Sequence, residues 1–128
     1  MIAIDTNILV RFLMRDDEAQ WARVCALIEG AAIYVPASVM LETAWVLRSI
    51  HGLRRIEVVD ALEQFMGLPN ASVETPERFA VTFDRVRKGL DFADALHLAS
   101  CDNCESLLTF DRQSVRRSRE ATPAVVEL

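Results

Sequence analysis

The chain has 128 residues, of which 52% are hydrophobic, and its 14 basic and 19 acidic residues give a net charge of −5. This length predicts one domain over residues 1–128 that buries a core without disulfides, and the composition excludes the disordered, collagen-like and low-complexity classes. The negative charge disfavours a protein that holds duplex nucleic acid by bulk positive charge, although a nucleic-acid enzyme with local basic patches stays possible.

The predicted elements alternate between short apolar strands and amphipathic helices. In the first half we expect a strand over 2–5, helices over 7–14 and 16–29, a strand over 31–35, and helices over 37–51 and 54–66. In the second half we expect a strand over 71–74, helices over 76–88 and 91–103, a strand over 106–110, a polar connection over 111–120, and a strand over 124–127. Such alternation predicts an α/β fold, a three-layer α/β/α sandwich around a central, mainly parallel sheet.

The cysteines and the hydropathy pattern indicate the cellular setting. Cys25, Cys101 and Cys104 form an odd set that suits a reducing compartment, and the spacing of the last two is only weak support for a zinc site. No apolar run approaches the roughly 20 residues that span a bilayer, and the first residues lack the basic region of a signal peptide. We therefore expect a cytoplasmic protein without a membrane segment.

Acidic residues stand at four places where a doubly wound sheet presents its ligand-binding edge. Asp5 and Asp111 each follow a predicted strand, Glu42 lies in the helix after the second strand, and Asp94 lies in the helix before the fourth. Ligands of such sheets bind at the carboxyl ends of the strands. We therefore expect these carboxylates to converge on one edge.

Each acid also has a purely structural interpretation, which the sequence leaves open. Asp5 and Asp111 stand where helix-capping residues are common, and Glu42, alone in an apolar stretch, could reach water along a narrow exposed face. Asp91 and Asp94 are spaced as in a capping box, although the same spacing puts both on one side of the helix start.

Carboxylates gathered at one edge favour a metal centre. They repel one another, and some would take up protons at neutral pH unless a cation lay between them. Mg²⁺ prefers oxygen ligands of this kind, and a metal-activated water is a standard nucleophile for phosphodiester hydrolysis. The chain has no phosphate-binding P-loop, dinucleotide-binding glycine motif or GxSxG motif that would indicate a competing chemistry.

The residues around these acids resemble those of a known family. Asp5 in DTN, Glu42 in the helix after PAS, Asp94 in DFADALHLA and Asp111 in LLTFDR resemble the PIN-domain ribonucleases. More narrowly, they resemble the VapC-like toxins of bacterial type II toxin–antitoxin modules. The resemblance covers essentially the whole chain and rests on the order, spacing and strand–helix context of the four acids.

The resemblance implies a function, partners and a site. It implies an endoribonuclease that depends on Mg²⁺ or Mn²⁺, has the α/β/α fold, often forms a homodimer, and is inhibited by a cognate antitoxin. The implied site residues are the catalytic acids Asp5, Glu42, Asp94 and Asp111, of which Asp5 and Asp94 bind the metal, and the accessory residues Thr6 and Asp91.

Two other function classes compete with the ribonuclease. A phosphoacceptor regulatory domain would have an acidic pair after its first strand and a lysine near its end, but no lysine follows Lys88. A catalytically silent PIN-like binding module would be expected to have lost some carboxylates, and all four positions are acidic here.

Two features lie outside the acidic pattern. After Asp111, many members of this family have another acid and an aromatic residue, whereas this chain has Arg112 and Gln113. The basic segment Arg116–Arg119 is either a solvated turn or a phosphate contact. In addition, the helices over 37–66 are more apolar than a small sheet is expected to cover. A second copy, an antitoxin or a larger core would account for this excess.

Overall fold

The computed structural model describes all residues from Met1 to Leu128. The chain forms two compact units, which we call the N-terminal unit (Met1–Pro76) and the C-terminal unit (Glu77–Leu128). Five strands and seven helices alternate along the chain, and every strand pair is parallel. The expected α/β class with parallel strands is therefore confirmed, whereas the expectation of a single domain over residues 1–128 stays a prediction.

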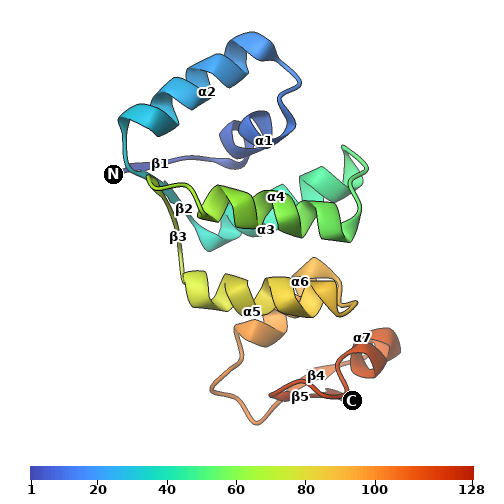
Figure 1. Ribbon diagram of the computed structural model, residues 1–128. Coiled ribbons are helices and arrows are strands. Elements are labelled where there is room, and N and C mark those ends of the chain that lie inside the picture. Colours follow the sequence, from blue (N-terminus) through green and yellow to red (C-terminus); the bar gives the residue numbers. More distant parts are fainter. The chain divides into compact units, whose positions relative to one another are not determined.

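The N-terminal unit is a small parallel sheet with four helices (Figure 1). Its elements are β1 (Ile2–Ala3), α1 (Thr6–Met14), α2 (Glu18–Gly30), β2 (Ile33–Val35), α3 (Ala37–Ser49), α4 (Arg55–Met66) and β3 (Ala71–Val73). The strand order is β1-β2-β3, and Ile33 of the central strand is in register with Ile2 on one side and Ala71 on the other. The side chains of Ile33 and Val35 have no exposed surface, so β2 forms the centre of this unit.

The helices of the N-terminal unit pack a core around that strand. The helix α3 packs against both α1 and α4, and the rings of Phe12 and Phe65 meet edge to face with their centroids 5.9 Å apart. Most of the apolar residues that seemed in excess over 37–66 are core residues: Met40, Leu47, Val58, Val59 and Phe65 are buried. A larger core therefore accounts for most of that excess, and the exposed apolar residues that remain are Ile50 at 66%, Trp45 at 60% and Ile56 at 45%.

The C-terminal unit consists of two helices followed by a two-stranded sheet with a short helix. Its elements are α5 (Pro76–Arg87), which begins at the boundary, α6 (Phe92–Ala99), β4 (Ser106–Thr109), α7 (Arg112–Arg117) and β5 (Ala124–Glu127). Aromatic packing joins α5 to α6, since the ring centroids of Phe83 and Phe92 are 6.2 Å apart. The helix α7 packs against both strands of the sheet, in which Ser106 is in register with Ala124.

Two sequence predictions for the C-terminal unit are wrong. The residues expected as a polar connection contain the helix α7, because the Asp111 carboxylate caps it by accepting the N–H groups of Gln113 and Ser114. The helix expected over 91–103 ends at Ala99, where turns take over. No helix of the chain combines the length and the apolar character that crossing a membrane requires.

Candidate functional site

Asp5 and Thr6 lie where the first strand passes into the first helix. The Oδ1 atom of Asp5 accepts the backbone N–H of Ile8 at 3.1 Å, so Asp5 is the N-cap of α1. This bond uses Oδ1, and the exposed side chain keeps Oδ2 for other partners. Thr6, the first residue of the helix, is only 7% exposed. The capping interpretation of Asp5 is therefore confirmed, and it leaves one carboxylate oxygen available to a ligand.

Glu42 lies within α3, among residues that form the core of the N-terminal unit. The adjacent Thr43 has no exposed surface, whereas Glu42 itself is exposed. The helix therefore turns its single carboxylate outward, as the interpretation of a narrow exposed face predicted. This position gives the carboxylate access to water and to a dissolved ligand.

The C-terminal unit places three carboxylates within electrostatic reach of one another. Burial raises the pKa of the Asp94 carboxyl above its usual value, and the nearby charges of Asp91 and Asp111 raise it further. Electrostatic interactions with His97 and Arg117 lower the pKa of Asp94 by smaller amounts. The Asp91 and Asp111 carboxylates therefore place negative charge around Asp94 and disfavour the ionised form of its carboxyl.

The positions of Asp91 and Asp111 have different local causes. Asp91 occupies the N-cap position of α6, but its side chain makes no capping hydrogen bond, so the capping-box interpretation is wrong. Asp111 is held firmly, because its backbone N–H donates to the Thr109 hydroxyl at 3.0 Å and its Oδ1 caps α7. As at Asp5, the cap uses Oδ1 and leaves Oδ2 outside these bonds.

The comparison with protein families extends over both units. The family model described as "PIN domain" matches residues 2–120. The chain belongs to the PIN domain family. PIN domains are generally nucleases and typically use divalent metals, which supports the coarse assignment as a nuclease. No curated protein matches the chain closely enough to count as a relative.

The donor set of this PIN domain suits a divalent cation by its chemistry. Within either unit, no three His, Cys, Asp or Glu side chains are grouped so that they could hold a metal ion, and this includes Cys101 and Cys104. However, the carboxylates that raise the pKa of Asp94 form an excess of negative charge that a cation would relieve. All of these donors are carboxylate oxygens, the ligands that Mg²⁺ and Mn²⁺ prefer.

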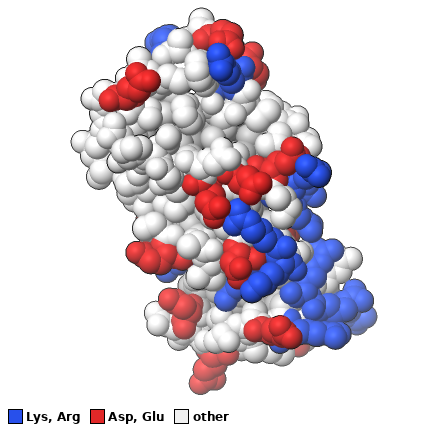
Figure 2. All heavy atoms as spheres, viewed as in Figure 1, with Lys and Arg blue, Asp and Glu red and all other residues white.

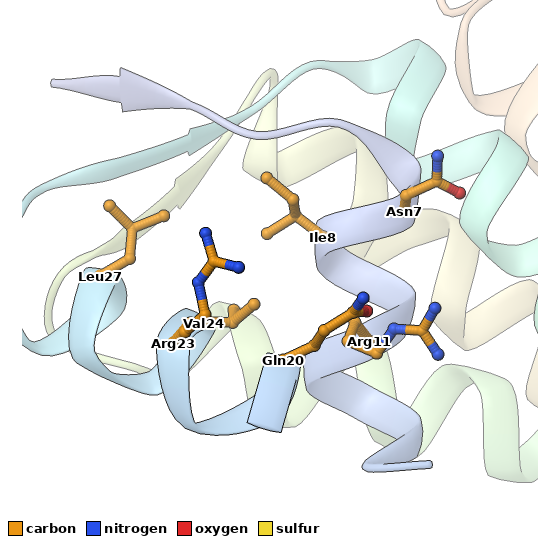
Figure 3. Close-up of a pocket in the computed structure, with 7 residues that line it drawn as sticks. All are labelled: Asn7, Ile8, Arg11, Gln20, Arg23, Val24 and Leu27. Atoms are coloured by element: carbon orange, nitrogen blue, oxygen red, sulfur yellow. The ribbon is translucent and has the colours of Figure 1, made fainter. Parts of the chain in front are cut away.

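A hollow in the N-terminal unit lies between α1 and α2 (Figure 3). It measures about 410 Å³, and Ile8, Val24 and Leu27 supply its apolar part. Of its two arginines, Arg11 already donates to the Asp16 carboxylate at 2.8 Å and thereby lowers the pKa of Asp16. No carboxylate lines this hollow. It therefore offers no carboxylate ligands for a metal ion.

Proposed function

We propose that this PIN domain is a metal-dependent endoribonuclease. Its proposed catalytic acids are Asp5, Glu42, Asp94 and Asp111, with Asp5 and Asp94 as ligands of Mg²⁺ or Mn²⁺, and Thr6 and Asp91 have accessory roles. The observation that carries the proposal is the partly buried Asp94, whose pKa is raised by burial and by the nearby carboxylates of Asp91 and Asp111. A nuclease that neutralises phosphate charge with a metal ion needs such a set of acids.

The residues of this chain have separate tasks in the proposed reaction. When bound, a divalent cation supplies an acidified water and positive charge beside the phosphodiester. Asp94 acts as a ligand through its ionised carboxylate, and the positive charge of Arg117 favours that form because it lowers the pKa of Asp94. Asp5 and Asp111 offer Oδ2 while Oδ1 holds a helix start, so the cap fixes the direction of each carboxylate.

The proposed substrate is RNA that is single-stranded or looped. A-form duplexes present a deep and narrow major groove that side chains cannot read, so recognition of RNA by a small domain favours exposed single strands. The net charge of −5 agrees with this choice, because the chain lacks the overall positive charge that binds duplexes without regard to sequence.

The test is cleavage of a labelled single-stranded RNA by the purified chain. We expect cleavage with Mg²⁺ or Mn²⁺, none with a chelator, and a loss of more than about 100-fold in rate for Asp94→Asn and Asp5→Asn. Asp102→Asn is a matched control in the C-terminal unit, since Asp102 is an exposed acid outside the cluster. Full activity of both Asp94→Asn and Asp5→Asn would refute the proposal, and an inactive wild-type chain would favour a silent binding module.

We also propose that this ribonuclease is the toxin of a toxin–antitoxin module. The support is the resemblance of the DTN, DFADALHLA and LLTFDR segments to VapC-like toxins. Induced expression in a bacterial host should arrest growth, whereas expression of Asp94→Asn should not. Co-expression of the protein encoded by the neighbouring gene should restore growth if that protein is the cognate antitoxin. Unimpaired growth with abundant active enzyme would contradict the toxin role.

A homodimer is the third part of the proposal. Trp45 on α3 and Ile56 on α4 are 60% and 45% exposed, on two helices that pack against each other, and a second copy that covered them would remove this apolar surface from water. Sedimentation over a range of concentrations should show a dimer that Trp45→Glu converts to monomer. A monomer at all concentrations would exclude the homodimer and leave the ribonuclease proposal unaffected.

A further inference from the structure

A polar hollow in the C-terminal unit gathers basic side chains from two separate segments. It measures about 660 Å³, within the range of roughly 300–1,000 Å³ typical of ligand pockets. Its basic residues are Arg85 and Lys88 from α5 and Arg116, Arg117 and Arg119 from α7 and the turn after it. Only two acids, Asp84 and Glu120, line the hollow. Figure 2 shows the corresponding concentration of basic side chains on this part of the surface.

Two polar groups that line this hollow are buried without a hydrogen-bond partner. Ser118 is 4% exposed, and its hydroxyl has no partner. Arg85 donates from Nη2 to the Thr122 carbonyl at 2.9 Å, while its buried Nη1 has no partner. Buried polar groups in folded proteins are nearly always paired, so two unpaired donors beside one hollow indicate a missing acceptor. An anion bound in the hollow would bring acceptor oxygens to the wall that these two residues form.

The remaining basic groups specify the kind of anion. Lys88 is already committed to Asp84, with its Nζ atom 2.9 Å from Oδ2. The exposed Arg116, Arg117 and Arg119 form no ion pair with an acid of the chain. Guanidinium groups match the oxygens of a phosphate in pairs, so unpaired arginines around a buried hydroxyl favour a phosphate group. The arginines of this segment are exposed, as the interpretation of a solvated turn predicted, whereas Ser118 between them is buried.

We propose that this hollow binds a phosphate of a single-stranded RNA chain, at a position separate from the phosphate that is cleaved. The identity of the polyanion rests on the proposed ribonuclease function. The link to that function is Arg117, which lines the hollow and also lies close enough to Asp94 to affect it electrostatically. A strand held in the hollow would thus lie within the same unit as Asp91, Asp94 and Asp111, and the arginines of the hollow would offset the negative charge of its phosphate.

The test measures binding rather than cleavage, so that the two proposals fail separately. A labelled 12-nucleotide RNA is titrated in the presence of a chelator, which prevents cleavage, and fluorescence anisotropy is recorded at several salt concentrations. We expect Arg116→Ala/Arg119→Ala to weaken binding at least tenfold at low salt. The slope of log affinity against log salt should fall by about 0.7 for each lost phosphate contact. Arg48→Ala/Arg78→Ala removes as much charge outside the hollow and should change the affinity less than threefold.

Ser118→Ala separates a ligand-binding role from a structural one. Because the hydroxyl has no partner in the free chain, its removal should leave the thermal midpoint unchanged or slightly higher. Loss of a hydrogen bond to a charged phosphate should weaken RNA binding by roughly tenfold. A drop in the thermal midpoint with unchanged RNA affinity would assign the hydroxyl to the fold and would overturn its role in binding.

A second arm distinguishes RNA from a free anion. Inorganic phosphate is titrated against the ¹⁵N-labelled chain, and the resonances of Arg85 and Ser118 are followed. If phosphate shifts them and the RNA affinity depends on Arg116 and Arg119, the proposal is supported. If phosphate binds while the double variant binds RNA as the wild type does, the hollow is a small-anion site and the RNA assignment fails. If neither ligand depends on these residues, the proposal is overturned, whatever the cleavage assay shows.

Discussion

The two units of the chain differ in the distribution of their charged residues and in how deeply their strands are buried. The N-terminal unit carries six basic and ten acidic residues, and Ile33 and Val35 of its central strand β2 have no exposed surface. The C-terminal unit carries eight basic and nine acidic residues, with acids gathered around Asp94 and basic residues gathered around the hollow. Its sheet leaves apolar side chains exposed, for example Leu108 at 56% and Val126 at 42%. The numbers of basic and acidic residues in the C-terminal unit are therefore nearly equal, but the two kinds gather at different places within the unit.

The largest expected effect tests how separate the two units are. Phe65 in the N-terminal unit and Phe83 in the C-terminal unit are both about 1% exposed, so replacing either by alanine should cost about 3–5 kcal/mol of unfolding free energy. Both tryptophans, Trp21 and Trp45, lie in the N-terminal unit, so their fluorescence reports on that unit alone. If the chain is one domain, Phe83→Ala should lower the denaturant midpoint measured by fluorescence as well as that measured by circular dichroism. A fluorescence transition unmoved by Phe83→Ala would instead establish two independently folding domains.

A smaller effect should separate the helix-capping role of Asp5 from its proposed catalytic role. Asp5→Ala removes the N-cap of α1 and should cost about 1 kcal/mol, whereas asparagine caps helices as well as aspartate does. Asp5→Asn should therefore keep the stability of the wild type and lose cleavage. Thermal unfolding and the RNA assay measure the two properties side by side. Equal stability of Asp5→Ala and Asp5→Asn would show that the cap contributes nothing.

The same substitution at Asp111 extends this comparison to the C-terminal unit. Asp111 accepts two backbone N–H groups at the start of α7, so Asp111→Ala is expected to be at least as destabilising as Asp5→Ala, and Asp111→Asn nearly neutral. Thermal unfolding of Asp5→Ala and Asp111→Ala would test whether the second variant loses at least as much stability as the first. A harmless Asp111→Ala would mean that the packing of α7 on the sheet, rather than the cap, holds this helix.

Two buried threonines provide a matched pair across the units. Thr43 and Thr82 both have no exposed surface, but the Thr82 hydroxyl donates to the Arg78 carbonyl at 2.8 Å, whereas the Thr43 hydroxyl has no partner. Thr43→Val should be neutral or stabilising by up to about 1 kcal/mol, because it removes an unpaired buried polar group. Thr82→Val should cost about 0.5–1.5 kcal/mol. Equal effects in urea unfolding would contradict the difference in hydrogen bonding.

The smallest effect concerns the carboxylate cluster and its dependence on pH. Because the fold raises the pKa of Asp94, the folded chain binds this proton more readily than the unfolded chain, and stability falls as rising pH ionises the group. Asp94→Asn should therefore raise the free energy of unfolding at pH 7, by less than about 1 kcal/mol because the side chain is partly exposed. The gain should vanish below about pH 3.9, where the wild-type carboxyl is protonated in both states. A destabilised Asp94→Asn at pH 7 would show that the carboxylate is favourably paired.

The sequence was most informative where a local signal and a burial pattern agreed. The helix after DTN, the buried strand around Ile33 and the parallel pairing of the strands all match the structure, because caps and apolar runs act over a few residues. The helix α7 was missed because residues 112–117 show no apolar periodicity, although the Asp111 cap that starts it was visible in the sequence. Without an apolar face, the helix propensity of residues 112–117 was too weak to predict a helix.

The candidate site was predictable as a set of residues but not as an electrostatic arrangement. The four acids could be selected from their positions after strands and in helices, and their assignment as catalytic residues stays a proposal. The raised pKa of Asp94 depends on burial and on Asp91 and Asp111, which lies 17 positions further along the chain. Similarly, Arg85 and Ser118 line one hollow only because α5 and the turn after α7 come together within their unit. Such proximity is a property of tertiary packing, which the residue pattern alone does not contain.

The capping bond at Asp5 has an evolutionary consequence. Aspartate and asparagine codons differ by a single nucleotide, and asparagine satisfies the helix start as well as aspartate does. A gene for this chain would thus have a mutational route, one base long, to a folded protein without the proposed activity. Selection for stability alone would not oppose that change, so an aspartate retained here would have to be maintained by the demand for its negative charge.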